Sequence, residues 1–443
     1  MNCIRKLFLC GSILTATTVS AQDFNQYFED NTLRLDYIFA GDSAKQAIYF
    51  EQAYKQPVWA GRKKRLAEKF LNGNGQITIR DHQTGQVIYV NTFSTLFQEW
   101  QSTAEATHVE KAFESSYNIP FPKKAIDVTV TLTDVHQKIS SKLTHTIDPN
   151  DILIRPIGEN NIPYRYILKS GDVSDCVDIA IVAEGYKENQ MDKFYADCQR
   201  AADALFEREP FKSLKNRFNI VAVASPSLDA GPCIPRNHQW KRSAVNTHYD
   251  TFYSDRYLTT SSIHHLYDLL SGVPFEQIIV LVNSSTYGGG GIYNQVTLST
   301  SDHATFKQVF VHEFGHGYAG LGDEYFYDDQ YSSMYPADTE PWEPNLTTLV
   351  DFKSKWEDML PLKTKIPTPP ANIPDFKTAR TEKDLKKIND ATQRIGVFEG
   401  GGYQSKGVYR PAQECRMKIN EVKDFCPVCK RAIERITDYY TSK

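Results

Sequence analysis

The sequence lacks the features that would point to a membrane span or a nucleic-acid partner. No segment has the run of about 18 apolar residues that a transmembrane helix needs. The formal net charge of the 443 residues is −4 and no basic block occurs, so nucleic acid is not an expected partner. Only one CxxC pair is present, Cys426 and Cys429, which excludes a four-cysteine metal site built from two such pairs.

The first 21 residues are typical of a signal peptide. Arg5 and Lys6 give a short positive region, the apolar LFLCGSIL follows, and small residues precede a cleavage site after Ala21. We therefore expect an exported protein that is periplasmic, bound to the cell surface or extracellular. Lipidation at Cys10 is the alternative, and the bulky residues before it disfavour it.

Export affects how the remaining cysteines are interpreted. An even number in an oxidising compartment permits disulfides, although the spacing does not assign the pairs. We interpret the cluster near the C-terminus as a disulfide cluster, in preference to a redox motif or a zinc knuckle. Its members are Cys415, Cys426 and Cys429; the others are Cys176, Cys198 and Cys233.

Residues 22–160 are predicted to form an N-terminal β-sandwich domain. The segment 75–93 alternates apolar and polar residues on both sides of a Thr84-Gly85 turn, which predicts a hairpin. Residues 125–135 and 32–41 also have the pattern of strands, and only about 60–71 has a helical pattern. Mostly strands with few helices indicate a small all-β domain.

Residues 161–443 are predicted to form an α/β domain with a central sheet. Apolar strands at 176–186, 217–227 and 275–285 alternate with helical spacing at 189–207. A proline-rich run followed by many charges predicts a surface insertion at about 361–390.

Within this domain, VFVHEFGHGYAGLGDEY (309–325) has the pattern of a zinc site. His312 and His316 lie one helical turn apart, so both imidazoles can reach one cation. Glu313 lies beside them, where it can take a proton from a metal-bound water. Apolar residues at helical spacing around the motif support a helix. A plain helix with two unrelated histidines is the alternative.

A catalytic zinc ion takes three protein ligands, so a third is required. A continued helix would place Asp323 about 10 Å beyond His316 along the axis. The chain must therefore turn back, and glycines at 320 and 322 allow the φ > 0 of such a reversal. Asp323 is favoured as the third ligand because its compact carboxylate directly follows the turn. Glu324 remains the alternative ligand or a hydrogen-bond partner of a histidine.

At this point the sequence resembles the IgA peptidase family of secreted bacterial zinc metallopeptidases. HEFGHGYAGLGDEY carries the likeness, together with VAEGYKENQMDKFYADC, FNIVAVASPS, TYGGGGIYN and VFEGGGYQSKGVYRPAQECRM followed by FCPVC. The resemblance covers nearly all of residues 165–435, and these segments occur in it in order. One departure is Gly317, where the family often has Ser or Ala.

The resemblance implies a zincin-like (metzincin-like) α/β peptidase domain behind an N-terminal β domain. Compared with the metzincin pattern HExxHxxGxxD, the glycine and the aspartate each come one residue later. The resemblance also implies roles for the motif residues: zinc ligands His312, His316 and Asp323, general base Glu313, and Met417 in a turn that forms an apolar floor beneath the metal.

Two further stretches are candidates for substrate contact. The glycine-rich stretch could form a flat strand whose backbone pairs with an extended peptide, and a flexible loop is the alternative. Tyr409 and Arg410 are candidates for lining a specificity pocket, and packing around the turn is the alternative. Tyr325 and Tyr335 are candidates for stabilising the oxyanion. The glycine-rich candidates are Tyr287, Gly288, Gly289, Gly290 and Gly291.

The sequence therefore predicts a secreted endopeptidase with one catalytic Zn²⁺ that acts on protein or glycoprotein substrates. Immunoglobulin A is one candidate, by the family's name alone. The alternatives are a non-catalytic binding or adhesion protein on a peptidase fold, and a zinc hydrolase acting on cell-wall peptides. The oligomeric state is not indicated.

Overall fold

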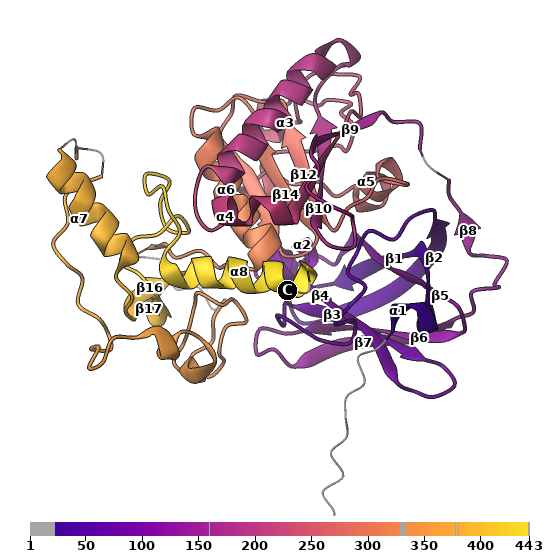
Figure 1. Cartoon of the computed structure of the whole chain (residues 1–443), viewed down its shortest axis with the longest axis horizontal. Coiled ribbons are helices and arrows are strands. Elements are labelled where there is room, and N and C mark those ends of the chain that lie inside the picture. Colours follow the sequence, from indigo (N-terminus) through magenta and orange to yellow (C-terminus); the bar gives the residue numbers. More distant parts are fainter. Residues whose placement is uncertain (1–22, 159, 328–333, 377, 380, 442–443) are drawn as a thin grey trace, which may run out of the picture.

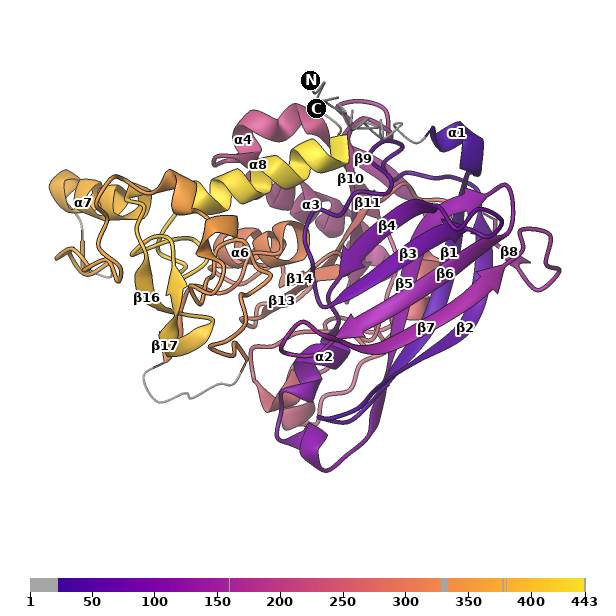
Figure 2. The same ribbon diagram turned by 90° about the horizontal axis from the view of Figure 1, so that it is seen from below.

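The structure is a computed structural model that describes residues 23–158, 160–327, 334–376, 378–379 and 381–441. The predicted signal peptide, residues 1–21, lies outside the described residues. The chain forms an N-terminal β-rich part and a C-terminal part with a mixed sheet and helices (Figures 1 and 2).

The N-terminal part consists of two four-stranded sheets, ordered β5-β1-β2-β8 and β4-β3-β6-β7. They share one core, in which Phe93 of β4 lies 6.2 Å from Phe39 of β1 and 4.2 Å from Tyr117 of β5 between ring centroids. The elements are α1 (Phe24–Tyr27), β1 (Phe28–Gly41), β2 (Gln46–Gln56), β3 (Gly75–Asp81), β4 (Val87–Phe93), α2 (Leu96–Gln101), β5 (Lys111–Pro122), β6 (Ile126–Thr133), β7 (Ile139–Ile147) and β8 (Arg155–Pro156).

Two local predictions for this part have different outcomes. The hairpin around Thr84-Gly85 is confirmed, because β3 and β4 pair antiparallel and Gly85 has φ +71°. The helix at about 60–71 is wrong, since this segment consists of bends and turns. Tertiary contacts shape it instead: Leu66 is buried in the core, and the buried Arg62 guanidinium donates to the backbone carbonyls of Leu66 and Val90.

A six-stranded sheet ordered β13-β14-β12-β10-β11-β9 forms the centre of the C-terminal part. The four inner strands are parallel, and β9 and β13 are antiparallel edges. The strands are β9 (Tyr164–Leu168), β10 (Val177–Glu184), β11 (Phe218–Val223), β12 (Gln277–Val282), β13 (Gly289–Ile292) and β14 (Val296–Thr300). All residues of β10, β11 and β12 are buried, as their continuous apolar runs predict.

Helices cover both faces of this sheet. One face packs against α3, α6 and the C-terminal helix α8 (Pro427–Thr441), whereas the opposite face packs against α5. The helices here are α3 (Met191–Phe206), α4 (Phe211–Leu214), α5 (Ile263–Leu269) and α6 (Phe306–Ala319). Alternate residues of β10 therefore serve two cores: Ile179 and Ile181 one, Ala180 and Val182 the other.

The remaining elements form a smaller region beside the sheet (Figure 1). A three-stranded sheet has the order β15-β17-β16, and α7 begins within the segment predicted as a surface insertion, about 361–390, and ends three residues after it. The elements are β15 (Phe326–Tyr327), α7 (Glu382–Gln393), β16 (Phe398–Gly401), β17 (Tyr403–Arg410) and α8 (Pro427–Thr441). Along the described part of the chain, no helix is both long and apolar enough to cross a membrane.

The two parts contact each other closely around the sheet edge. Asn294, at the β13–β14 turn, donates to the carbonyl of Thr92, and the Tyr439 hydroxyl of α8 donates to the carbonyl of Glu68. The Ser94 amide donates to the carbonyl of Tyr293. The N-terminal part therefore borders the end of the sheet where α6 packs on β13 and β14.

Candidate active site

Helix α6 carries the predicted zinc motif and ends where the glycine turn was expected. Gly320 adopts φ +60° and its amide donates to the carbonyl of His316, which closes the helix. Gly322 has no such φ, so the prediction of φ > 0 there is wrong. The physical reason for glycine at this position is close packing, because a Cβ would lie 2.5 Å from Cδ1 of Leu346.

The turn brings Asp323 back to the two histidines. The two Nε2 atoms of His312 and His316 are 3.0 Å apart, and Asp323 Oδ1 lies 3.1 Å from the first and 3.2 Å from the second. A tetrahedral zinc site with bonds of about 2.0–2.1 Å separates its ligand atoms by about 3.3 Å. The three atoms thus have the spacing of a metal-ligand set.

Hydrogen bonds on the far side of each ring determine which nitrogen faces the site. Nδ1 of His312 bonds the carbonyl of Arg416 at 3.0 Å, and Nδ1 of His316 bonds the carbonyl of Leu321 at 2.5 Å. A carbonyl accepts only, so each Nδ1 carries a proton, and each Nε2 faces the site as the atom that can bind a metal once it is deprotonated. Asp323 Oδ1 is buried without a donor. Three lone-pair atoms therefore converge, and this donor set fits a zinc ion.

Asp323 is held in this orientation by the segment that leads into β17. The Tyr403 hydroxyl donates to Asp323 Oδ2 at 2.5 Å, which leaves Oδ1 directed at the histidines. The Gly402 amide donates to the carbonyl of Asp323 at 2.8 Å, and the Glu324 amide donates to the carbonyl of Met417 at 2.8 Å. The carboxylate is thus fixed through both its side chain and its backbone.

The electrostatics agree with a site for a cation. Burial alone lowers the pKa of His316, but Asp323 and Glu313 outweigh it and raise this pKa to about 9. Burial alone raises the pKa of Asp323, but His316 and His312 hold it well below its usual range. Burial raises the pKa of Glu313, partly opposed by the two histidines. A raised pKa suits a general base that works near neutral pH.

Met417 lies beneath the motif, as the resemblance implied. It is fully buried, and a Cβ on Gly315, between the two histidines on α6, would lie 2.9 Å from its sulfur. The residue before it supplies the carbonyl that orients His312. The turn 415–417 therefore supports α6 from below with an apolar floor.

Comparison with known protein families agrees with this geometry. The family described as IgA Peptidase M64 matches residues 166–388 and 374–437, and the family described as Peptidase M64 N-terminus matches residues 23–144. The chain belongs to the IgA peptidase M64 family. It is therefore a peptidase with a protein substrate. No curated protein sequence matches the chain.

The glycine-rich stretch of the peptidase packs tightly around α6. A Cβ on Gly289 would lie 2.8 Å from Cγ of Glu313, and one on Gly291 would lie 2.4 Å from its carbonyl oxygen. On the other side, a Cβ on Gly288 or Gly290 would meet the carbonyl of Arg256 or Leu258. These glycines let β13 approach the catalytic helix closely.

The outer edge of β13 is not free along its length, contrary to the prediction of an open strand for substrate. Tyr257 forms a bridge with Gly289, whose carbonyl accepts from the Leu258 amide at 3.2 Å. Just beyond the strand, the Tyr293 carbonyl accepts from Ser94. The chain itself thus engages the edge at both ends. Tyr287 lies before the strand, where its hydroxyl accepts from Asn420.

Four other predicted residues have different surroundings from those expected. Glu324 contacts no histidine; its Oε1 accepts from Asn345 and Cys429. Arg410 is buried and donates to carbonyls of Glu399 and Gly400, so it packs under β16 and does not line a substrate pocket. Its neighbour Tyr409 is half-buried, and its backbone pairs with Thr347. The Tyr335 hydroxyl donates to Glu343.

The structure also brings two residues to the site to which the sequence analysis assigned no role. Tyr403, 80 residues from Asp323, contacts the ring of Tyr325 at 5.2 Å and orients the carboxylate. Arg256 donates to the Tyr327 hydroxyl and interacts electrostatically with Glu313. Tyr403 lies in one of the segments that carry the family likeness and Arg256 lies outside them, but only the fold reveals the contact of either residue with the site.

The N-terminal part adds an acidic group near the motif. Glu99 of α2 accepts from the Tyr257 hydroxyl and interacts electrostatically with His316, Asp323 and Glu313. Burial raises its pKa to about 7.

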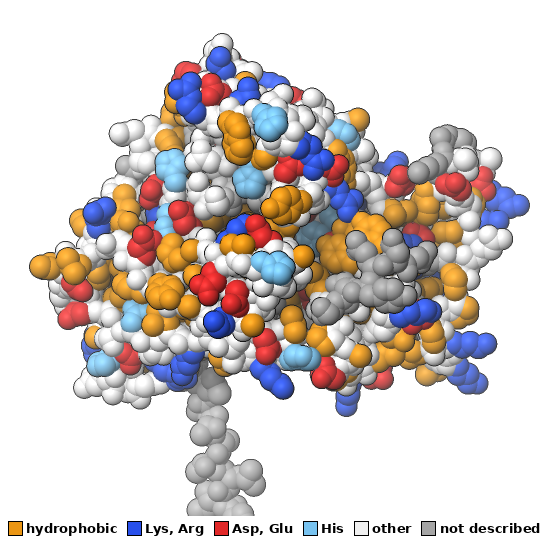
Figure 3. Space-filling model, turned by 180° about the vertical axis from the view of Figure 1, so that it is seen from behind, with side chains coloured by type: hydrophobic (Ala, Val, Ile, Leu, Met, Phe, Trp, Pro, Cys, Tyr) orange, Lys and Arg blue, Asp and Glu red, His pale blue; other side chains and the backbone are white. Residues whose placement is uncertain are grey.

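On the face shown in Figure 3, basic and acidic side chains are interspersed, with histidine and hydrophobic side chains between them. That face shows no extended basic patch of the kind nucleic-acid-binding proteins present.

Proposed function

We propose that the protein is an exported zinc-dependent endopeptidase with a metzincin-like catalytic domain. The observation that carries the proposal is the convergence of His312 Nε2, His316 Nε2 and Asp323 Oδ1 within 3.0–3.2 Å. Asp323 is the third ligand in this proposal, since the Glu324 carboxylate is engaged by Asn345 and Cys429. Export rests on the signal-peptide pattern of residues 1–21.

A zinc ion held by these three side chains would supply Lewis-acid activation of a water molecule and of the scissile carbonyl. Glu313 takes the proton from the attacking water on its carboxylate and delivers it to the leaving amine nitrogen. Burial of Glu313 makes its carboxylate a stronger base than an exposed glutamate. Arg256 interacts electrostatically with Glu313, so the base lies beside a cation that favours its ionised form.

The substrate is a protein or a glycoprotein cut at internal peptide bonds. Immunoglobulin A is one specific candidate, supported by the name of the family alone. A library of peptides digested by the wild-type enzyme would define the residues on both sides of the cut. Immunoglobulin A would be digested in parallel.

The decisive variant is Glu313→Ala. Loss of a general base lowers kcat/KM by about 100- to 10,000-fold, while the ligand atoms and hence the zinc content are retained. Zinc content by mass spectrometry and cleavage of the peptide library check both expectations. Equal inactivity of wild type and Glu313→Ala across the library would instead favour a binding protein on a peptidase fold.

The ligand assignment has its own test. Asp323→Asn is expected to lower the affinity for the catalytic zinc ion, because the amide offers no charge to the cation. Glu324→Gln is the matched control, since it changes the neighbouring carboxylate in the same way and leaves the His312–His316–Asp323 set intact. The zinc dependence of cleavage gives the affinity in each variant. A larger loss of affinity for the catalytic zinc ion in Glu324→Gln than in Asp323→Asn would overturn the assignment.

A further inference from the structure

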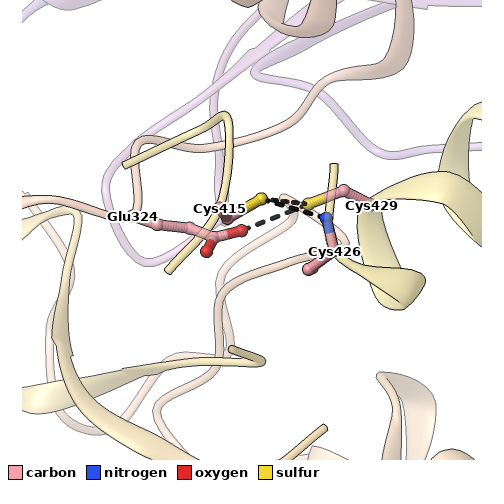
Figure 4. A group of neighbouring side chains, drawn as sticks. All are labelled: Glu324, Cys415, Cys426 and Cys429. Carbon is pink, nitrogen blue, oxygen red and sulfur yellow. Dashed lines mark hydrogen bonds between the residues drawn. The ribbon is translucent and has the colours of Figure 1, made fainter. Parts of the chain in front are cut away.

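A second group of metal-binding side chains lies beside the active site, on the other side of the segment that carries Asp323. We call it the thiol–carboxylate cluster: its members are Glu324, Cys415, Cys426 and Cys429. One potential ligand atom from each lies within 4.8 Å of the others, and all four residues are buried. In Figure 4 the Glu324 carboxylate and the sulfur atoms of Cys415 and Cys429 point toward one another.

The cluster is not joined by a disulfide, contrary to the sequence interpretation. Cys415, Cys426 and Cys429 form no disulfide, and the sulfur atoms of Cys415 and Cys429 are 3.9 Å apart. A disulfide bond holds its sulfur atoms at about 2.05 Å. One disulfide among three cysteines would also leave a third thiol buried next to a carboxylate.

The spacing fits a tetrahedral cation better. Zinc–thiolate bonds of about 2.3 Å separate two sulfur ligands by about 3.8 Å, close to the 3.9 Å between Cys415 and Cys429. Glu324 Oε1 lies 3.1 Å from the Cys429 sulfur, which brings an oxygen ligand into the same space. Three sulfurs and one oxygen complete a four-coordinate shell without water.

Two features of the surroundings are those expected of a cation bound in the thiol–carboxylate cluster. Glu324 is 0% exposed, yet its Oε2 atom has no hydrogen-bond partner, and a buried carboxylate oxygen without a partner is costly. Buried cations surround the cluster: Arg410 interacts electrostatically with Glu324, and Arg416 with Cys415. A divalent cation with three thiolates and one carboxylate carries a net charge of −2, which these guanidinium groups offset.

The backbone also suits thiolate ligands. The Cys426 amide donates to the Cys415 sulfur at 3.3 Å, a bond that stabilises a thiolate. Cys426 and Cys429 lie at the start of α8, where the positive end of the helix dipole favours negative charge. Three chain segments meet here: the Asp323–Glu324 turn, the 415–417 turn and the beginning of α8.

We propose that the thiol–carboxylate cluster binds a second, structural zinc ion. This ion would join the segment of Asp323 to the turn of Met417 and would thereby hold the third catalytic ligand in place. Soft thiolate ligands in a closed tetrahedral shell are characteristic of structural zinc. The proposal goes beyond the proposed function and does not depend on it, because its residues are separate from the catalytic ligand set.

The test uses the mature chain with the catalytic set removed by His312→Ala and His316→Ala. After exchange into Co²⁺, this double variant is expected to bind one cobalt ion per chain and to show thiolate-to-cobalt charge-transfer absorption. Histidine and carboxylate ligands give no such band. The wild-type chain is expected to bind two ions. A result that would overturn the proposal is the absence of the charge-transfer band.

Cysteine variants complete the experiment. Cys426→Ser in the same background is expected to lose the bound ion and the band, whereas Cys198→Ser, which changes a buried cysteine of α3, retains both. If Cys426→Ser does not fold, the intact mass of the double variant distinguishes a disulfide from free thiols. A mass lower than that of the reduced chain by two hydrogens indicates a disulfide and refutes the proposal. No readout is cleavage and the double variant lacks the two catalytic histidines, so failure of the proposed function would change only the second ion of the wild type and none of the outcomes for the double variant.

Discussion

The Tyr403 hydroxyl provides a test of how strongly metal binding depends on the orientation of the Asp323 carboxylate, the proposed third ligand. It donates to Asp323 Oδ2 at 2.5 Å, while Oδ1 faces the two histidines. Tyr403→Phe removes this donor and keeps the ring. The carboxylate is then free to rotate about its last bond, so Oδ1 no longer points at the ligand set in every conformer.

The magnitude follows from the type of bond. A hydrogen bond to a charged group contributes about 1.5–3 kcal/mol, equivalent to about 10- to 160-fold in an equilibrium constant. Since Tyr403 contacts Asp323 whether or not a metal is bound, only the orienting part of this energy affects metal affinity. Removing such supporting contacts typically weakens metal binding about 10- to 100-fold. We expect the dissociation constant of the catalytic zinc ion to rise within this range.

The assay is reconstitution of cleavage in zinc buffers after treatment with a chelator. The free zinc concentration at half-maximal activity gives the relative affinity. Tyr335→Phe is the matched control, because its hydroxyl also donates to a buried carboxylate, Glu343, at 2.9 Å, but not to a ligand. A change of less than twofold in Tyr403→Phe, or equal changes in both variants, would refute the reasoning.

Two further predictions concern the base and the packing of α6. The acidic limb of the pH profile of kcat/KM is expected to have its midpoint above the ordinary glutamate pKa of 4.5, because burial raises the pKa of Glu313. The carboxylate is the active form of this base, and it is lost as the pH falls through that pKa. A midpoint at or below 4.5 would contradict the assignment of Glu313 as the base. Gly317→Ala is expected to destabilise the fold by about 1–3 kcal/mol in denaturant unfolding, because its Cβ would lie 2.1 Å from Oγ1 of Thr297. Adding Thr297→Ala removes that atom and should restore part of the loss, whereas an unchanged midpoint in Gly317→Ala would show that the clash is relieved in another way.

The predictions that proved reliable rest on periodicity and on short-range geometry. The buried strands β10, β11 and β12 have continuous apolar runs, and the helical spacing of the histidines depends only on the pitch of a helix. Gly320 could be assigned from the need for a reversal. The prediction for the segment 60–71 is wrong because tertiary contacts place its apolar residues: Leu66 packs in the N-terminal core, whereas Phe70 and Leu71 pack against the core of the C-terminal part.

Roles that depend on long-range contacts could not be derived in this way. Arg410 and the glycines of β13 are candidates for substrate contact when only the sequence is considered. In the structure the guanidinium is enclosed under β16, and Gly289 and Gly291 admit the helix that carries Glu313. The same residue types serve packing or recognition, and only the neighbours distinguish the two.

The sequence by itself determined the HExxH motif, the helix turn that brings its histidines together, the glycine turn at Gly320 and the family, because these depend on residues close together in the chain. The sequence favoured Asp323 over its neighbour Glu324 but left both open, and the tertiary structure decided which of them faces the histidines, because the two carboxylates point into different sites. It also showed that Cys415, Cys426 and Cys429 form no disulfide and lie beside Glu324, although Glu324 and Cys429 are 105 residues apart in the chain. Their meeting depends on how α8 and the 415–417 turn pack against α6, and no local pattern records that packing.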